Sequence, residues 1–262
     1  INRWDTDNFP LSSKASAFAT DYGLPHGQCG WSVRSHPNVR AVYEKIFSSD
    51  DLCVGMDNLF FSPNRPSEKK DTDREDRLWP HADQNSNLPP QGKYDCYQGV
   101  LYVWPSDADS STTVIWPGSN KSVFPKLMKK RSFRGHFCML DREDHPEYLH
   151  HARRIPVPAG GLLLWSSKTI HQGWSHGKRL AVPVCYEPSK RRSEAALKSK
   201  LQCTKEGVPT THWASLGKPH TVAAAGTKQQ DGGCAEFPLR HVAHKHVLDA
   251  KGEVSEAIVK FL

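Results

Sequence analysis

The middle of the chain alternates short apolar and β-branched runs with turn residues, which is the pattern of an antiparallel β protein. Residues 94–104 (YDCYQGVLYVW) and 112–116 are rich in aromatic and β-branched side chains, and residues 162–165 form an apolar run directly after Gly160 and Gly161. The same signals predict strands at 52–61, 153–157, 168–174 and 179–186, the last two joined as a hairpin. The spacing of the turns suits a double-sheet jelly roll.

Apolar positions recur with helical spacing toward the two ends of the chain. Residues 37–47 start with Pro37 and place Val39, Tyr43 and Ile46 on one face, which predicts a helix. Further helices are expected at 121–131, 194–205 and 253–262. The fold class predicted from this pattern is mainly β with flanking helices. No run of about 18 apolar residues is present, so no membrane span is expected.

The charge balance narrows the class of partner. The 262 residues carry a net charge of +7, which favours anionic partners such as a carboxylate or phosphate substrate, or nucleic acid. An ordinary basic surface explains the charge equally well. The chain has no nucleic-acid-binding motif, and its basic clusters lack interleaved aromatic residues. A small-molecule substrate is therefore the first expectation, and nucleic acid stays open.

The cysteine pattern and two polar segments give less information about function. Seven cysteines are scattered without a CxxC pair, which is typical of reduced thiols in a cytoplasmic or organellar protein. No secretory signal is visible, and whether a targeting segment precedes Ile1 stays open. The charged run 67–77 is interpreted as a solvated loop, with a lid over a site as the alternative. The histidine-rich tract 241–246 is interpreted as an exposed tail rather than a metal site.

His81-Ala82-Asp83 is the strongest candidate for chemistry. Two ligands at i and i+2 on an extended segment point to the same side of the backbone. With His171 as a third ligand they would form the two-histidine, one-carboxylate triad of non-haem Fe(II) oxygenases. A chain with 14 histidines produces such a short motif by chance quite often, so the motif alone is weak evidence.

Arg179 strengthens this interpretation. If a hairpin turn is centred on Ser175, His171 and Arg179 are cross-strand neighbours on one face. A guanidinium beside a metal can bind one carboxylate of a dicarboxylate in a bidentate manner while the metal chelates the other end. A 2-oxoglutarate site requires this arrangement. The alternative for Arg179 is a surface salt bridge.

Six segments in a fixed order carry a resemblance to a known family. The chain resembles the phytanoyl-CoA dioxygenase-like branch of the Fe(II)/2-oxoglutarate oxygenases over about residues 50–215. The resemblance implies a double-stranded β-helix core, a single oxygenase domain over 1–262 with a C-terminal extension at 216–262, Fe(II) ligands at His81, Asp83 and His171, and a carboxylate-binding role for Arg179. The segments are WPHADQN, YQGVLYVWP, IWPGSNK, VPAGGLLLWSSKTIH, RLAVPVCYEPSK and GVPTTHW.

The resemblance also implies a reaction. The family uses Fe(II), 2-oxoglutarate and O2 to oxidise a C–H bond, most simply by hydroxylation, with release of succinate and CO2. Desaturation and cyclisation stay open, whereas the carboxylate of Asp83 disfavours halogenation. The alternatives are oxidation of a modified base in nucleic acid by the same chemistry and a cupin-type metal enzyme that does not use 2-oxoglutarate.

Several side chains near the motif are candidates for further contacts. Gln98 is expected to point into the barrel and bind the cosubstrate, with a packed strand glutamine as the alternative. Thr169 precedes His171 by two residues, so it is expected on the same face as a weaker cosubstrate contact. Three tryptophans could line a substrate pocket, although aromatic residues on strands usually belong to the core: Trp79, Trp104 and Trp174.

Overall fold

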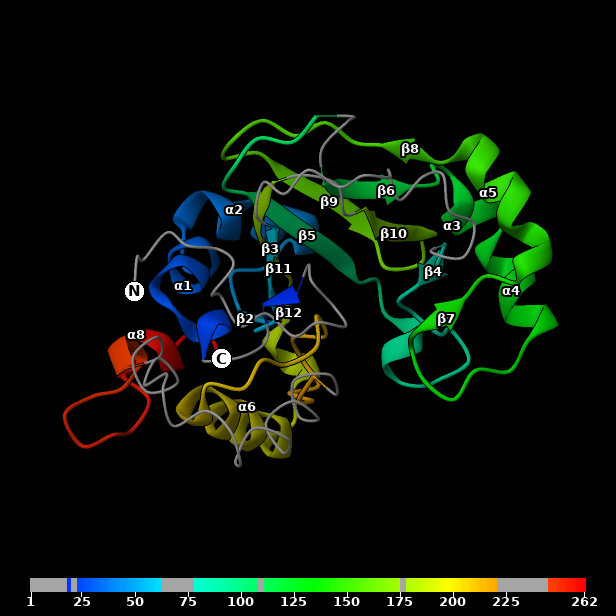
Figure 1. The fold of residues 1–262 in the computed structure, drawn as a ribbon. Helices are drawn as coiled ribbons and strands as arrows, with labels where there is room; N and C mark the ends of the chain where they lie inside the picture. Colours follow the sequence, from blue (N-terminus) through cyan, green and yellow to red (C-terminus); the bar gives the residue numbers. More distant parts are fainter. Residues whose placement is uncertain (1–17, 20–22, 63–77, 108–110, 175–177, 221–244) are drawn as a thin grey trace, which may run out of the picture. The chain divides into compact units, whose positions relative to one another are not determined.

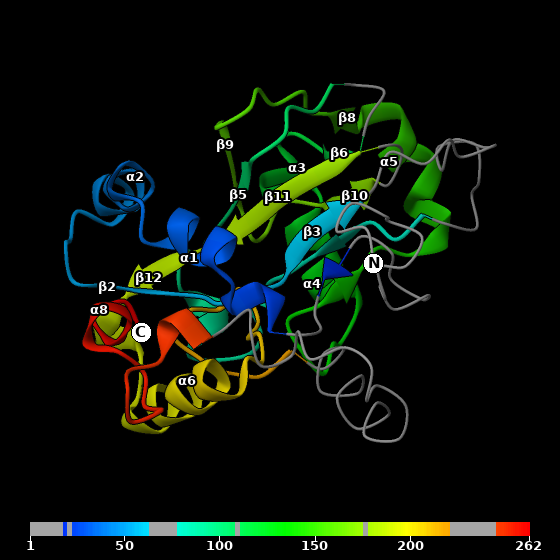
Figure 2. The same ribbon diagram turned by 60° about the vertical axis from the view of Figure 1, so that its left-hand side comes forward.

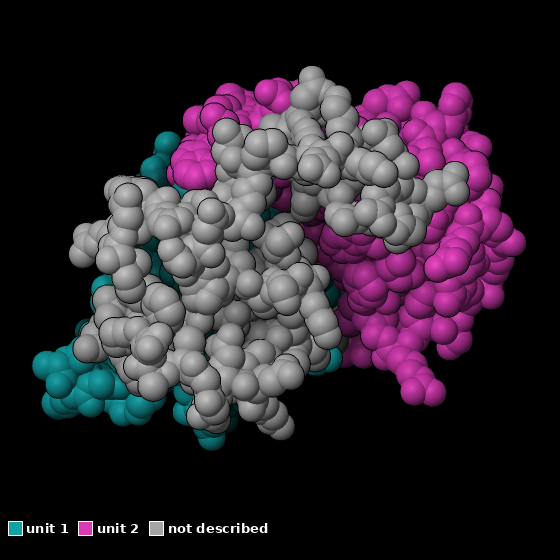
Figure 3. All heavy atoms as spheres, viewed as in Figure 1, with its two compact units in different colours: residues 1–61, 99–101, 180–262 teal, residues 62–98, 102–179 magenta. Residues whose placement is uncertain are grey.

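The structure is a computed structural model that describes residues 18–19, 23–62, 78–107, 111–174, 178–220 and 245–262. It divides into two compact units, coloured separately in Figure 3: unit 1 comprises residues 1–61, 99–101 and 180–262, and unit 2 comprises residues 62–98 and 102–179. The predicted 67–77 loop, the turn at 175–177 and residues 241–244 lie outside the described residues. The single domain and its core and extension boundaries stay predictions.

Unit 2 contains a five-stranded antiparallel sheet. Its strands, in spatial order, are β7 (Cys138–Met139), β4 (His81–Ala82), β10 (His171–Trp174), β6 (Thr112–Ile115) and β8 (Arg153–Arg154). Strands that are neighbours in this sheet are far apart in the sequence, as in a jelly roll and unlike a simple meander. The register places His171 opposite His81 on one side and opposite Ile115 on the other. Strand β9 (Leu162–Ser166) also belongs to unit 2.

Three helices lie beside this sheet (Figure 1): α3 (Ser119–Ser122), α4 (Phe124–Lys130) and α5 (His145–His151). Leu127 of α4 and Tyr148 of α5 belong to one hydrophobic cluster with Val114 and Trp174 of the sheet. A proline lies near the start of both α4 and α5. Backbone N–H groups at this position have no partner within the helix, so the missing N–H of proline costs no hydrogen bond. The predicted helix at 121–131 is thus two helices divided at Val123, and α5 was not predicted.

Unit 1 pairs strand β1 (Phe18–Ala19) with β3 (Leu59–Ser62), and β2 (Leu52–Val54) with β12 (Tyr186–Pro188). Its α-helices are α1 (Gln28–Arg34), α2 (Pro37–Phe47), α6 (Glu194–Glu206) and α8 (Glu256–Val259). Figure 2 shows α8 beside β2, and the Val54 N–H donates to the Phe261 carbonyl at 2.8 Å. The remaining elements are β5 (Tyr97–Tyr102), β11 (Arg179–Val184) and the 3-10 helices η2 (Leu24–His26), η5 (Gln91–Lys93), η6 (Arg142–Asp144), η7 (Ser189–Arg191) and η9 (Lys245–Val247).

Local sequence explains the ends of α6. The Ser193 side chain accepts from the Ala196 N–H at 3.1 Å and so caps the N-terminus. Gly207 ends the helix in the left-handed conformation at φ 71°, which glycine adopts without a steric penalty. The prediction of a mainly β fold with flanking helices is confirmed, and so are the helices at 37–47 and 194–205. No helix in the described part of the chain is long and apolar enough to cross a bilayer.

Two strand predictions are wrong. The run at 52–61 contains two strands, β2 and β3, rather than one. The predicted hairpin between 168–174 and 179–186 does not form, because β4 and β6 occupy the two edges of β10. A strand has only two hydrogen-bonding edges, so β11 cannot be the neighbour of β10. His171 and Arg179 are therefore not cross-strand neighbours.

Lys200 of α6 is fully buried within unit 1. Its ammonium donates to the carbonyl oxygens of Val54 at 2.7 Å and Ala214 at 3.0 Å, which ties α6 to β2 and to the segment after the helix. Burial lowers the pKa of Lys200 to about 8 because the charged form loses its hydration. The unfolded chain would titrate this group at a pKa of about 10.4.

This difference predicts that stability depends on pH through Lys200. Between pH 8 and about 10.4 the unfolded chain binds a proton that the folded chain has released, so the free energy of unfolding rises with pH by at most about 3 kcal/mol from this group. The Lys200→Met variant should lack that rise. Denaturant unfolding of both proteins at neutral and alkaline pH measures it. Parallel pH profiles in the two proteins would show that Lys200 titrates as in the unfolded chain.

Candidate metal centre

His81, Asp83 and His171 converge within unit 2. His81 Nε2 lies 3.5 Å from Asp83 Oδ1, and His171 Nε2 lies 3.4 Å from Asp83 Oδ2. All three potential ligand atoms lie within 4.8 Å of one another. The two histidines are buried, and the Asp83 side chain is 18% exposed. The structure thus brings the three predicted ligands together, while their role as ligands stays a prediction.

Backbone carbonyls orient both imidazoles. His81 Nδ1 lies 2.9 Å from the Trp79 carbonyl, and His171 Nδ1 lies 2.9 Å from the Thr169 carbonyl. A carbonyl only accepts, so each Nδ1 carries a hydrogen, and Nε2 is the ring nitrogen that faces Asp83. Burial, assisted by nearby His81, lowers the pKa of His171 and favours its neutral form, against the opposing effect of Asp83. Neutral imidazole is the form that binds metals.

Two hydrogen bonds position Asp83 just beyond the end of β4. Its backbone N–H donates to the Ser167 carbonyl at 3.0 Å, and the Gln98 side-chain amide donates to Oδ2 at 2.8 Å. Two imidazole nitrogens and a carboxylate therefore face one point, and all three are groups that can bind a metal cation. Two nitrogens and one carboxylate suit Fe(II), so the donor set fits the predicted metal.

The two residues predicted to contact the cosubstrate, Gln98 and Thr169, each form a hydrogen bond with a metal-ligand candidate. Gln98 is buried on β5, and its side-chain amide donates to Asp83. Thr169 is buried in the bend before β10, where its carbonyl orients His171. Contact of either side chain with a cosubstrate stays a prediction.

Aromatic rings surround the two histidines. The Trp79 ring stacks on His81 at 4.7 Å and 12°, and the Trp165 ring lies 5.1 Å from His171. Phe137 lies 4.6 Å from the His81 ring and is 52% exposed. These rings restrict how the imidazoles can turn and make the surroundings of the centre apolar.

The other two tryptophans predicted to line a pocket lie in different surroundings. Trp174 belongs to the hydrophobic cluster of unit 2, and the Arg154 guanidinium lies 4.2 Å from its ring centre. Trp104 is partly buried. For Trp174 the core interpretation is the correct one.

Arg179 is the first residue of β11 and belongs to unit 2, where it is 4% exposed. Its guanidinium donates to the Tyr102 hydroxyl at 3.0 Å and to the Thr113 hydroxyl at 3.2 Å. Burial lowers the pKa of Arg179, and the neighbouring Tyr102 opposes this effect. Thr113 lies two residues, or about 7 Å, along β6 from Ile115, which faces His171. The guanidinium therefore lies against the same sheet as the metal-ligand candidates, although no hairpin brings it there.

Tyr102 and Thr113 were not recognised in the sequence. Gln98 and Tyr102 are separated by four residues on β5, and such positions share a face of a strand. The structure agrees, because Gln98 binds Asp83 and Tyr102 binds Arg179. The period-two pattern starting from Gln98 was the signal that could have identified Tyr102.

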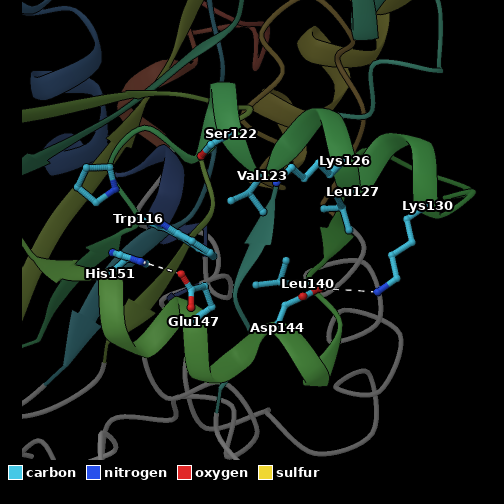
Figure 4. A pocket seen from close by; sticks show the side chains of 11 residues that line it. Trp116, Ser122, Val123, Lys126, Leu127, Lys130, Leu140, Asp144, Glu147 and His151 are labelled. Atoms are coloured by element: carbon cyan, nitrogen blue, oxygen red, sulfur yellow. Dashed lines mark hydrogen bonds and ion pairs between the residues drawn. The ribbon is translucent and has the colours of Figure 1, made fainter.

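A groove of about 600 Å³ lies elsewhere on unit 2 (Figure 4). Four of its ionisable side chains form two close pairs: Lys130 lies 3.9 Å from Asp144, and His151 lies 2.8 Å from Glu147. None of the three metal-ligand candidates lines it. The groove is therefore separate from the candidate metal centre. Its lining residues are Trp116, Pro117, Ser122, Val123, Lys126, Leu127, Lys130, Leu140, Asp144, Glu147 and His151.

Comparison with known sequences gives one curated relative and no family. No family model matches the chain. "Ava biosynthesis cluster protein O" from Aspergillus versicolor is 24% identical over 225 residues, which cover 80% of this chain and 70% of that protein. The phytanoyl-CoA dioxygenase-like branch is not named by any comparison, so that resemblance stays a prediction.

Solved structures with a similar fold are more distant in sequence. GIG2 (DUF1479) from Candida albicans matches with TM-score 0.50 and 11% identity over 74% of this chain and 58% of its own. The epimerase SnoN in complex with Fe3+, alpha ketoglutarate and nogalamycin RO matches with TM-score 0.45 and 14% identity over 66% of this chain and 63% of its own. EctD from S. alaskensis with 2-oxoglutarate and 5-hydroxyectoine matches with TM-score 0.44 and 12% identity over 64% of this chain and 56% of its own. The chain spans less than two thirds of the length of each of these structures. The double-stranded β-helix core predicted from the sequence is confirmed.

The bond between Gln98 and Asp83 predicts a measurable effect on metal affinity. Replacing Gln98 with Leu removes the donor that orients the carboxylate, so the Kd for Co(II), a spectroscopically visible substitute for Fe(II), should rise roughly 10- to 100-fold. Titration calorimetry measures the Kd. Gln202→Leu on α6 is the matched control and should leave it unchanged. Equal Kd values for the wild type and Gln98→Leu would contradict the assigned role.

Proposed function

We propose that this chain is an Fe(II)- and 2-oxoglutarate-dependent dioxygenase that hydroxylates a C–H bond of a small molecule. The observation that carries the proposal is the convergence of His81, Asp83 and His171, with the buried Arg179 against the same sheet. Overall, O2, 2-oxoglutarate and R–H would give succinate, CO2 and R–OH. The biosynthesis cluster in the name of the Aspergillus relative favours a small-molecule substrate.

Three side chains would hold the iron. The two imidazoles and the Asp83 carboxylate would bind it, because two nitrogens and one carboxylate are a donor set that suits Fe(II). When bound, Fe(II) would supply the activation of oxygen that amino-acid side chains cannot provide. His81 and His171 are buried, which would limit the access of water to a metal bound there. Gln98 holds the Asp83 carboxylate in the orientation that faces both imidazoles.

Arg179 would bind the cosubstrate's distal carboxylate. Tyr102 and Thr113 fix the guanidinium, so its planar donors are already oriented before the dicarboxylate arrives. The distance along β6 between Thr113 and the residue facing His171 is comparable with the length of a five-carbon dicarboxylate. One end of 2-oxoglutarate would then reach the metal while the other end reaches Arg179.

Loss of a metal ligand should abolish the reaction. The His81→Ala and Asp83→Ala variants should release no succinate from 2-oxoglutarate, because two ligands do not retain the iron. His150→Ala, which removes an exposed histidine of α5, is the matched control and should keep wild-type turnover. Succinate is quantified by mass spectrometry across a metabolite panel. Unchanged turnover in either ligand variant would exclude the proposed site.

Loss of the guanidinium should affect the cosubstrate and spare the metal. In Arg179→Met the concentration of 2-oxoglutarate at half-maximal rate should rise roughly 10- to 100-fold, because charge-assisted bonds to a carboxylate are lost. Fe(II) binding should stay at the wild-type value. Arg153→Met, an exposed arginine on β8, serves as the control. An unaltered half-saturating concentration would mean that Arg179 does not bind 2-oxoglutarate.

A further inference from the structure

Phe137 is both exposed and in contact with a metal-ligand candidate. Its side chain is 52% exposed, yet its ring lies 4.6 Å from the ring of His81 at an interplanar angle of 39°. Single exposed apolar side chains are common on protein surfaces and need no explanation. An exposed ring in contact with a metal-ligand candidate is different, because a molecule bound beside that candidate can also contact the ring.

The backbone around Phe137 is tied to the strand that carries His81. Cys138, the next residue, pairs with Ala82 in the register of β7 and β4. The Leu140 N–H donates to the Pro80 carbonyl at 2.8 Å. Phe137 therefore keeps its place beside His81 through the pairing of the two strands.

Asn85 secures the loop that leads into Phe137. It follows Asp83 by two residues and is 1% exposed. Its side-chain amide donates to the carbonyls of Phe133 at 3.0 Å and Gly135 at 3.2 Å. Its backbone N–H donates to His136 Nδ1 at 3.2 Å. The segment carrying Asp83 thus also holds the loop, so the exposed ring is pre-organised relative to the candidate metal centre.

We propose that Phe137 is a specificity-determining residue whose exposed ring packs against a planar aromatic part of the substrate. The inference rests on the proposed function and names a substrate class for it. A held ring loses little conformational freedom on binding, and a second ring stacked on it gains more than area burial alone. Trp79 stacks on the same imidazole, so the surroundings of the Phe137 ring are aromatic rather than aliphatic.

The test compares two probes of similar size, 2-naphthol and its saturated counterpart 2-decalol. Equilibrium dialysis against the protein loaded anaerobically with Fe(II) and 2-oxoglutarate measures both Kd values. The wild type should bind 2-naphthol roughly three- to tenfold more tightly than 2-decalol. Phe137→Ala should lose this preference, and Phe137→Trp should keep it. Leu149→Ala, which removes another exposed apolar side chain of unit 2, should keep the wild-type preference.

Every outcome bears on the proposal. Absence of a preference in the wild type, or its persistence in Phe137→Ala, would overturn the role of Phe137. The Fe(II) and 2-oxoglutarate retained in the same dialysis cells test the proposed function separately. Retention of both without a preference for 2-naphthol would reject the Phe137 inference alone. If the protein retains neither Fe(II) nor 2-oxoglutarate but still shows a preference that depends on Phe137, the proposed function is rejected. The aromatic binding site at Phe137 would then still stand.

Discussion

The candidate centre depends on one geometric constraint: three groups able to bind a metal face the same point. The Nδ1 atoms of His81 and His171 are bound to backbone carbonyls, so their Nε2 atoms turn toward the Asp83 carboxylate. A cation bound between these three groups would be stabilised by all of them. The remaining features of the site keep the three groups together or build on them.

The sheet of unit 2 supplies the necessary alignment. Antiparallel pairing of β4 with β10 sets His81 opposite His171, so the two ligand candidates meet through backbone hydrogen bonds. Gln98 and the Ser167 carbonyl then fix Asp83, and the bonds of Tyr102 and Thr113 fix Arg179. Most of the side chains that would contact iron or cosubstrate are thus positioned by strands or by their immediate ends. That arrangement provides the pre-organisation that a metal-dependent reaction needs.

Whether a residue's role could be predicted from the sequence depends on how far apart in the chain its contacts lie. The spacing of His81 and Asp83 is local, so their convergence followed from strand geometry alone. His171 was assigned with the help of a family resemblance, and Arg179 was placed by a hairpin that does not exist. Both residues nevertheless lie against the same sheet. Phe137 and Asn85 escaped prediction because their contacts depend on the long-range pairing of β7 with β4, which no local pattern reveals.

The most direct measurement of the central claim is the visible absorption of the Fe(II)-loaded protein titrated anaerobically with 2-oxoglutarate. If the metal and the cosubstrate share the site built by His81, Asp83, His171 and Arg179, a charge-transfer band should appear only when both are present. It should saturate at one 2-oxoglutarate per iron. Protein that binds Fe(II) and 2-oxoglutarate without developing the band would show that the two do not meet, and would contradict the account.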